Sequence, residues 1–165
     1  MRILVTGIGA RCGTSAMMRT LLSDGMTPSP AAEKFPSYCA PSKNPEGFWD
    51  LSPEMIQSTE AIRLEENEIV KVFSYFYYQV DWSTVDLIVV MYRNDREAQI
   101  TSMHETALAE GFEATPAMVD LMIRDPHDLL DHIPSPTIYI EIEELRSNPE
   151  LVLSKIKEAD TWVQQ

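Results

Sequence analysis

Hydrophobic residues are arranged along this chain in two patterns, short uninterrupted runs and longer stretches with helical spacing. Uninterrupted runs of β-branched and aliphatic residues predict strands. These runs cover residues 2–6, 69–73, 86–92 and 137–141. Apolar residues three or four positions apart predict helices. These stretches cover residues 14–23, 52–66, 94–110 and 115–132, and a last helix begins after residue 148. Apolar strands that alternate with helices are typical of a parallel sheet. We expect an α/β fold with a mainly parallel sheet, helices on both faces and the first strand at its centre.

Residues 26–50 interrupt this alternation with five of the chain's 11 prolines, set among serines and alanines. This composition predicts a long loop, and a loop of that length inside a compact domain is usually functional or disordered. The chain of 165 residues is long enough to bury a core. We therefore expect a single domain over residues 1–165, with this loop as an insertion.

The first predicted strand leads into the glycine-rich segment GIGARCG, residues 7–13, and then into the first predicted helix. A strand, a glycine-rich loop and a helix in that order place backbone N–H groups and the positive end of a helix dipole at one spot, which favours an anion. Nucleotide hydrolases have a lysine directly after the last glycine of this loop. Here that position is Thr14, and the cation of the loop is Arg11. The residues also fit a turn that binds nothing.

The segment RCGTS, residues 11–15, resembles the 5′-phosphosulfate loop of the sulfotransferases, R/K-S-G-T-[ST], with Cys12 in place of serine. Those enzymes have a P-loop NTPase-like α/β fold and use 3′-phosphoadenosine 5′-phosphosulfate (PAPS) as donor. The resemblance implies that the loop and the start of the helix bind the 5′ end of PAPS, through a side chain or through backbone N–H groups. The residues concerned are Arg11, Cys12, Gly13, Thr14, Ser15 and Ala16.

Residues 89–102, VVMYRNDREAQITS, resemble the sulfotransferase segment that binds the 3′-phosphate of PAPS. In that family an arginine ends a hydrophobic strand and a serine follows eight residues later. Arg93 matches the arginine, and Thr101 keeps the hydroxyl at the eighth position. An arginine at the carboxyl end of a parallel strand faces the crevice where open α/β sheets bind ligands, and its planar fork pairs well with phosphate. Alternatively, Arg93 is exposed and pairs with Asp95 or Glu97.

Two further segments extend the resemblance over nearly the whole chain. Residues 44–50, NPEGFWD, look like the segment that lines the acceptor pocket of bacterial-type sulfotransferases. Residues 142–150, IEELRSNPE, resemble a late structural passage of the family. The first segment also fits a turn with two packed aromatic side chains.

Candidates for catalysis are less specific. Lys71, on a predicted strand, is a candidate cation over the sulfuryl group, or a lysine whose ammonium reaches solvent. Glu46 and Asp50 are candidate general bases, or solvated loop carboxylates. We give less weight to the three histidines His104, His127 and His132. The aromatic run at residues 73–78 packs in the core or forms a wall of the acceptor pocket.

Charge and cysteine content restrict the partners. The formal net charge is −13, from 13 basic and 26 acidic residues, which disfavours a general nucleic-acid or anionic-membrane surface. The two cysteines have no metal-like spacing, no secretory leader precedes the first strand, and no apolar run is long enough to span a membrane. We expect a cytoplasmic protein without a metal.

The predicted function is a sulfotransferase that moves a sulfuryl group from PAPS to a hydroxyl or amine of a small molecule or glycan and releases 3′,5′-ADP. Two alternatives stay open. One is a sulfotransferase-like nucleotide-binding module without turnover, because no basic segment follows Lys157. The other is a P-loop nucleotide kinase or hydrolase, against which the missing lysine argues.

Overall fold

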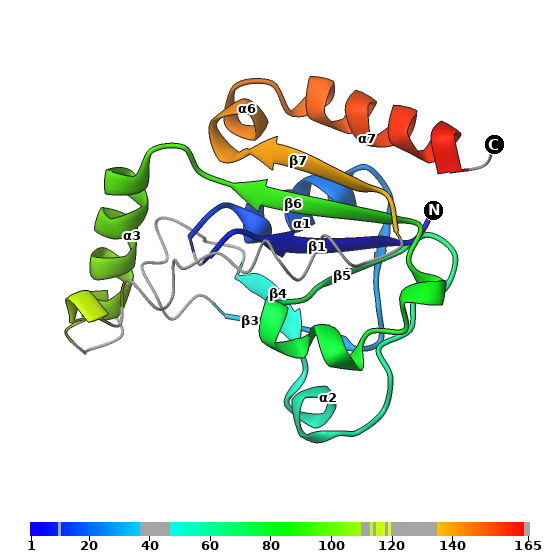
Figure 1. Ribbon diagram of the computed structural model, residues 1–165, viewed down its shortest axis with the longest axis horizontal. Coiled ribbons are helices and arrows are strands. Elements are labelled where there is room, and N and C mark those ends of the chain that lie inside the picture. The colour runs from blue at the N-terminus through cyan, green and yellow to red at the C-terminus, as the bar shows by residue number, and fades with distance from the viewer. Residues whose placement is uncertain are drawn as a thin grey trace.

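The structure is a computed structural model that describes residues 1–9, 11–36, 47–109, 113, 115–117, 119 and 135–163. In this part of the chain, five parallel strands form the central sheet in the order β2-β5-β1-β6-β7 (Figure 1). The strands are β1 (Ile3–Gly7), β2 (Thr27–Pro28), β5 (Glu68–Lys71), β6 (Leu87–Tyr92) and β7 (Thr137–Glu141). The predicted α/β fold, the parallel sheet and the central position of β1 are confirmed. The fold is consistent with a P-loop-like arrangement.

The central strand β1 lies where the chain changes direction across the sheet. It pairs with β5 on one side, with Val5 opposite Lys71, and with β6 on the other, with Gly7 opposite Met91. Open α/β sheets bind ligands outside the carboxyl ends of their strands at such a switch point. The loop after β1 and the residues after β6 therefore meet at the edge of the sheet where a ligand is expected.

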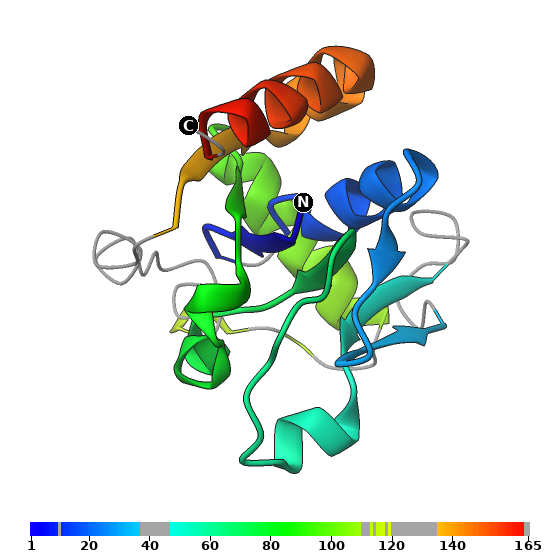
Figure 2. The same ribbon diagram turned by 90° about the vertical axis from the view of Figure 1, so that its right-hand side faces the viewer.

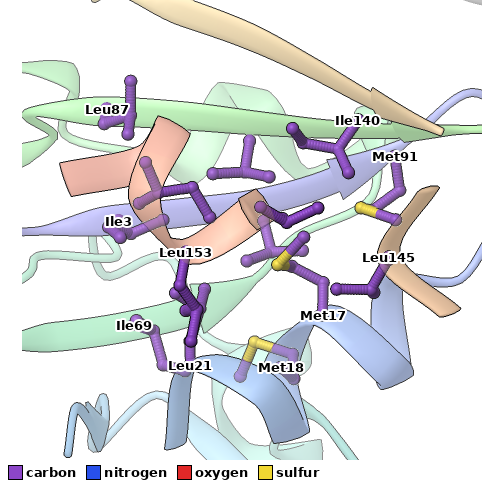
Figure 3. Packing of buried hydrophobic residues seen from close by; sticks show 14 of the residues in the cluster. Ile3, Met17, Met18, Leu21, Ile69, Leu87, Met91, Ile140, Leu145 and Leu153 are labelled. Carbon is purple, nitrogen blue, oxygen red and sulfur yellow. The ribbon is translucent and has the colours of Figure 1, made fainter. Parts of the chain in front are cut away.

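One face of the sheet is covered by α1 (Thr14–Ser23), α6 (Ile142–Ser147) and α7 (Pro149–Val163). Their apolar side chains interlock with those of the strands, as Figure 3 shows for Met17, Leu21 and Leu153. The helical spacing of these residues in the sequence places them on one side of each helix. The fully buried residues of this layer include Ile3, Met17, Met18, Ile69, Leu87 and Met91.

The opposite face is covered mainly by short elements. The 3-10 helices η1 (Ser74–Gln79) and η2 (Trp82–Thr84) lie on this side, away from α1 and α7 (Figure 2). Side chains of the strands that point this way, such as Leu4 and Ile88, pack against residues from the intervening segments. Those residues include Leu51, Ile62, Leu64, Tyr77 and Val80. Alternate residues of β1 and β6 thus face two separate apolar layers, which explains why both strands are apolar throughout.

The segment predicted as a long loop, residues 26–50, contains strands, and the prediction was wrong for its described parts. Here β2 adds to the edge of the sheet, and β3 (Ala32–Phe35) pairs antiparallel with β4 (Phe48–Leu51). Pro28 lies in a two-residue strand at the edge of the described sheet, a position that tolerates proline. Residues 36–47 separate the two strands in the sequence, too many for the short turn that marks a hairpin in a sequence pattern. Of these, residues 37–46 lie outside the described residues.

The helix predicted over residues 52–66 is much shorter. It begins as predicted, with Ser52 Oγ accepting a hydrogen bond from the Met55 N–H at 3.1 Å, but α2 ends after one turn (Pro53–Gln57). Beyond it the chain is extended, and Ile62 exchanges backbone hydrogen bonds with Gln79 (2.7 Å) and Asp81 (3.0 Å). Burial of Ile62 under η1 and η2 therefore competes successfully with continuation of the helix.

Other helix boundaries follow the prediction more closely. The Asn148 side chain caps α7 by accepting from the Leu151 N–H at 3.1 Å, as expected. The helix predicted over residues 94–110 is α3 (Arg96–Ala109), which is capped by Asp95, since Asp95 Oδ1 accepts from the Ala98 N–H at 2.8 Å. The short helix α6 was not predicted, and most of the helix predicted over residues 115–132 lies outside the described residues. None of the described helices is long and apolar enough to cross a bilayer.

Acid should weaken the fold through Asp86. Its carboxylate bonds to the Arg2 guanidinium and backbone N–H, and these contacts, the Arg2 side chain first, lower the pKa of Asp86. A lowered pKa stabilises the folded state above the unfolded value of about 3.9, and this contribution is lost as the pH falls through the folded value. Asp86→Asn should lower the free energy of unfolding at neutral pH and flatten its dependence on pH in this acid range. Urea unfolding at several pH values tests this, with the exposed residue change Glu60→Gln as the control. If the free energy of unfolding changes equally with pH in both variants, the prediction is wrong.

Candidate functional site

The loop after β1 is shaped by close contacts around two glycines. A Cβ at Gly7 would lie 2.1 Å from Cys12 Sγ, and a Cβ at Gly13 would lie 2.7 Å from Ile142 Cγ1. Gly13 also has a φ of 102°, in the left-handed region that favours glycine. The loop is tied to the sheet by the Ile8 N–H, which donates to the Met91 carbonyl at 2.8 Å. Only small residues allow the loop to fold back over the strand ends in this way.

This loop leads directly into the N-terminus of α1. Gly13 is the N-cap residue, no side chain caps the helix within the described chain, and its first turn holds no acidic residue. Ser15 and Ala16 are half-exposed, while the Thr14 side chain is buried. The positive end of the helix dipole is therefore not neutralised by a capping carboxylate, which leaves it available to an anion.

Cys12 faces inward rather than toward a ligand. Its side chain is 1% exposed, and its Sγ donates to the Gly9 carbonyl at 3.1 Å. Burial raises the pKa of the thiol to about 11, while the nearby charges of Lys71 and Arg11 act in the opposite direction. The residue that replaces serine in the resembling motif therefore packs under the loop, and its role toward a ligand is limited to its backbone.

The Cys12 thiol should resist modification in the folded protein. In a Cys39→Ser variant, Cys12 is the remaining cysteine of the two in the sequence. Because the thiolate is the reactive form, a buried thiol with a raised pKa reacts slowly. We expect labelling by a chromogenic disulfide reagent to be about 100-fold or more slower than after unfolding in urea. Rapid labelling of the folded protein would contradict the buried position.

Arg11 leaves the loop toward α3. Its backbone has a φ of 63°, which is uncommon for a residue with a side chain, and its guanidinium is exposed. The Arg11 Nε donates to Ser102 Oγ at 3.1 Å, and Gln99 Nε2 donates to the Ile8 carbonyl at 3.3 Å. These bonds hold α3 beside the loop, at the side of the sheet toward which β6 and β7 point (Figure 1).

Arg93 lies just after β6, and its side chain is 11% exposed. Its Nη1 donates to the Ala98 carbonyl at 3.3 Å and its Nη2 to Glu143 Oε1 at 3.5 Å. The Nε is buried without a hydrogen-bond partner among the described residues. The alternative interpretation, an exposed arginine that pairs with Asp95 or Glu97, is therefore wrong. A largely buried guanidinium whose Nε lacks a partner is a costly arrangement, which an anion that reached this atom would relieve.

These elements line an open pocket of about 620 Å³. Among the described residues, three arginines line it, one from the loop after β1, one from the end of β6 and one from α6. With the polar residues of α3, the lining includes Arg11, Arg93, Arg146, Thr101, Ser102 and Glu105. We call it the arginine pocket. It brings together Arg11, Arg93 and Thr101, which the sequence had suggested from separate motifs.

Lys71 and Asp50 form a second cluster. The Lys71 ammonium lies 2.9 Å from Asp50 Oδ2, and it sits 5.3 Å from the Phe48 ring centre and 5.0 Å from that of Phe73. Lys71 is 3% exposed, so the interpretation as a lysine that reaches solvent is wrong. The other oxygen of Asp50 accepts a hydrogen bond from the Leu51 N–H at 3.0 Å. Neither Lys71 nor Asp50 lines the arginine pocket.

The aromatic run after β5 divides between core and surface. Tyr77 is buried, its hydroxyl lies 2.7 Å from Thr6 Oγ1, and burial raises its pKa to about 12. Tyr75 is 65% exposed and stacks on Phe73, with ring centres 5.8 Å apart. Its pKa is raised by partial burial and by the charge of Asp50, which places Tyr75 near the Lys71–Asp50 pair.

No protein-family model, curated protein or solved structure matches this chain. Its function has therefore to be inferred from the residues of the site themselves.

Glu46, His127 and His132 lie outside the described residues. His104 is half-buried on α3. The sequence reasoning missed Arg146 as a site residue, because it lies in the segment interpreted as structural. The sequence places Arg146 just before the cap of the last helix. It contains nothing that indicates that α6 packs beside Arg93.

Proposed function

We propose that this protein is a PAPS-dependent sulfotransferase that acts on a hydroxyl or amine of a small molecule or glycan. The observation that carries the proposal is the arginine pocket, in which Arg11 and Arg93 meet from the ends of two neighbouring parallel strands. Residues 13–16 at the start of α1 are not in its lining, and Arg11 in the loop before them is. The chain as a whole is acidic, with a formal net charge of −13. A local cluster of guanidinium groups in an acidic protein indicates a specific anionic ligand rather than a general polyanion surface.

The residues present fit a ligand with two phosphate-bearing ends. Arg93 has a buried Nε without a partner among the described atoms, and its guanidinium is fixed by the Ala98 carbonyl. A guanidinium held in one orientation loses little entropy when it binds a phosphate in bidentate fashion. We assign the 3′-phosphate of PAPS to Arg93 and Thr101. We assign the 5′ end to Arg11 and to the N–H groups at residues 13–16.

When bound, PAPS would supply the sulfuryl group, whose bond to the phosphate oxygen breaks as the acceptor oxygen or nitrogen bonds to sulfur and loses a proton. The chain's part in such a reaction is to align the two groups and to stabilise charge on the leaving phosphate. We assign the second task to Arg11 and to the uncapped N-terminus of α1.

We assign the catalytic roles beside the acceptor to Lys71 and Asp50, because the resemblance places residues 44–50 at the acceptor pocket and Asp50 pairs with Lys71. Asp50 holds the Lys71 ammonium through Oδ2 and accepts from the Leu51 N–H through Oδ1. For Asp50 to take up the acceptor proton, Lys71 has to release Oδ2, so the pair would act together: Lys71 turns to the transferred group as Asp50 turns to the acceptor. Glu46 is the other proposed base.

Two experiments test the proposal. Isothermal titration with 3′,5′-ADP should show binding, and absence of binding at millimolar ligand would overturn the assignment of the pocket to PAPS. Transfer of radioactive sulfate from PAPS to a panel of phenols, alcohols, amines and glycans should then label a product. Binding without transfer would indicate the module without turnover, and magnesium-dependent binding of ATP in preference to 3′,5′-ADP would indicate a nucleotide kinase or hydrolase.

A further inference from the structure

Arg146 on α6 is a member of the arginine pocket that the sequence did not suggest. Its side chain is 55% exposed, and its Nη1 donates to Glu143 Oε1 at 2.8 Å. The same oxygen lies 3.5 Å from the Arg93 Nη2. One carboxylate oxygen therefore lies between two guanidinium groups that both line the pocket.

This arrangement leaves positive charge in the pocket. Among the described residues, its lining includes three guanidinium groups and one carboxylate, that of Glu105, and the Glu143 carboxylate pairs with Arg93 and Arg146. Glu143 is half-exposed, so its contacts with the arginines are weakened by solvent. The Arg93 contact is also long, and the Arg93 Nε has no partner among the described residues. Glu143 thus satisfies Arg93 incompletely.

We propose that Arg146 is a third phosphate-binding residue of the arginine pocket, and that Glu143 is an internal competitor that a phosphate monoester displaces. A monoester carries nearly two negative charges at neutral pH and has three terminal oxygens, whereas a carboxylate carries one charge and two oxygens. A phosphodiester carries a single charge, so it gains little from replacing Glu143. The pocket therefore selects a terminal phosphate monoester. This deepens the proposed function, on which it rests only for the identity of the natural ligand.

The test measures affinity by titration calorimetry with 3′,5′-ADP, with adenosine 3′-monophosphate, with cyclic 3′,5′-AMP as the diester, and with inorganic phosphate. The variants are Glu143→Gln and Arg146→Gln. Glu144→Gln is the matched control for the glutamate, because Glu144 is the next residue on α6 and pairs with Lys155 instead. Arg63→Gln is the control for the arginine, because Arg63 is 70% exposed and pairs with Asp81. Thermal unfolding of each variant checks that it is folded.

We expect Arg146→Gln to weaken binding of the monoesters about tenfold, the loss of one charge-assisted hydrogen bond. We expect Glu143→Gln to tighten it about fivefold, because the competitor is gone. The two controls should change affinity by less than about twofold. The wild-type protein should bind cyclic 3′,5′-AMP more weakly than adenosine 3′-monophosphate. The difference in affinity between these two ligands should be smaller in Glu143→Gln.

The outcomes separate this inference from the proposed function. If 3′,5′-ADP binds but Glu143→Gln and Arg146→Gln behave as their controls, the inference is wrong and the proposed nucleotide site stands. If 3′,5′-ADP does not bind but inorganic phosphate does, with the expected changes in both variants, the inference stands and the proposed function fails. If none of the four ligands binds at millimolar concentration, both are wrong.

Discussion

Arg93→Gln should weaken binding of 3′,5′-ADP by about 100-fold or more, equivalent to about 3 kcal/mol. The expected loss is large because the Arg93 side chain is 11% exposed and is already held by the Ala98 carbonyl. Hydrogen bonds from a charged donor that is partly removed from water are stronger than those at an exposed surface. Arg93→Lys keeps the charge but loses the planar fork, so we expect it to recover only part of the affinity.

The measurement is isothermal titration, with Arg63→Gln as the matched loss of an exposed arginine. Arg93→Gln also removes a hydrogen bond to the first turn of α3, so the unfolding temperature of each variant has to be recorded. A folded Arg93→Gln protein that binds 3′,5′-ADP as tightly as the wild type would remove the central residue of the proposed site.

The part of the site that could be predicted from the sequence is the part that depends on local patterns. The strand, loop and helix at residues 3–23 follow one another without a gap, and each has its own signal in composition or spacing. Arg93 follows directly after an apolar strand. Because the carboxyl ends of parallel strands lie at one edge of a sheet, the proximity of Arg11 and Arg93 could be inferred without coordinates.

The parts that could not be predicted depend on contacts between distant segments. Asp50 reaches Lys71 because β4 pairs with β3 and packs against the sheet, and nothing around residue 50 in the sequence indicates that pairing. The predicted helix at residues 52–66 gives way to an extended segment because Ile62 bonds to the chain at residues 79–81. Arg146 enters the pocket because α6 turns back beside the end of β6.

Three separate segments each contribute a positive side chain to the arginine pocket. The positive groups of the arginine pocket come from the loop after β1, the end of β6 and α6, and each is accompanied by polar or acidic neighbours such as Ser102 and Glu143. Ion pairs at an exposed surface contribute little to stability. The arginines of the pocket are therefore better explained by a ligand than by the fold, which the apolar layers on both faces of the sheet already stabilise.

Gly7→Ala should destabilise the fold strongly, by about 3 kcal/mol or more. The φ of Gly7 is not positive, so an alanine fits the backbone and the cost comes from contacts. The new Cβ would lie 2.1 Å from Cys12 Sγ and 2.9 Å from Thr14 Cγ2. Relief of both overlaps has to move the loop that carries Arg11 and the start of α1. We therefore expect binding of 3′,5′-ADP to weaken as well, by about tenfold or more in the folded fraction.

A double-variant cycle separates this overlap from other causes. Cys12→Ala alone removes a buried sulfur and should cost about 1 to 2 kcal/mol. In the Gly7→Ala, Cys12→Ala protein the sulfur no longer overlaps the new Cβ. We therefore expect the double variant to lose about 2 kcal/mol less free energy of unfolding than the sum of the losses in the two single variants. Gly25→Ala is the contrasting control, because Gly25 has a φ of 101° and open space around it, so its cost comes from the backbone alone. Urea unfolding gives the free energy of unfolding of the four variants and the wild type. Additive costs for Gly7→Ala and Cys12→Ala would show that the loop does not close over β1 through this contact, and the position of Arg11 would then need another cause.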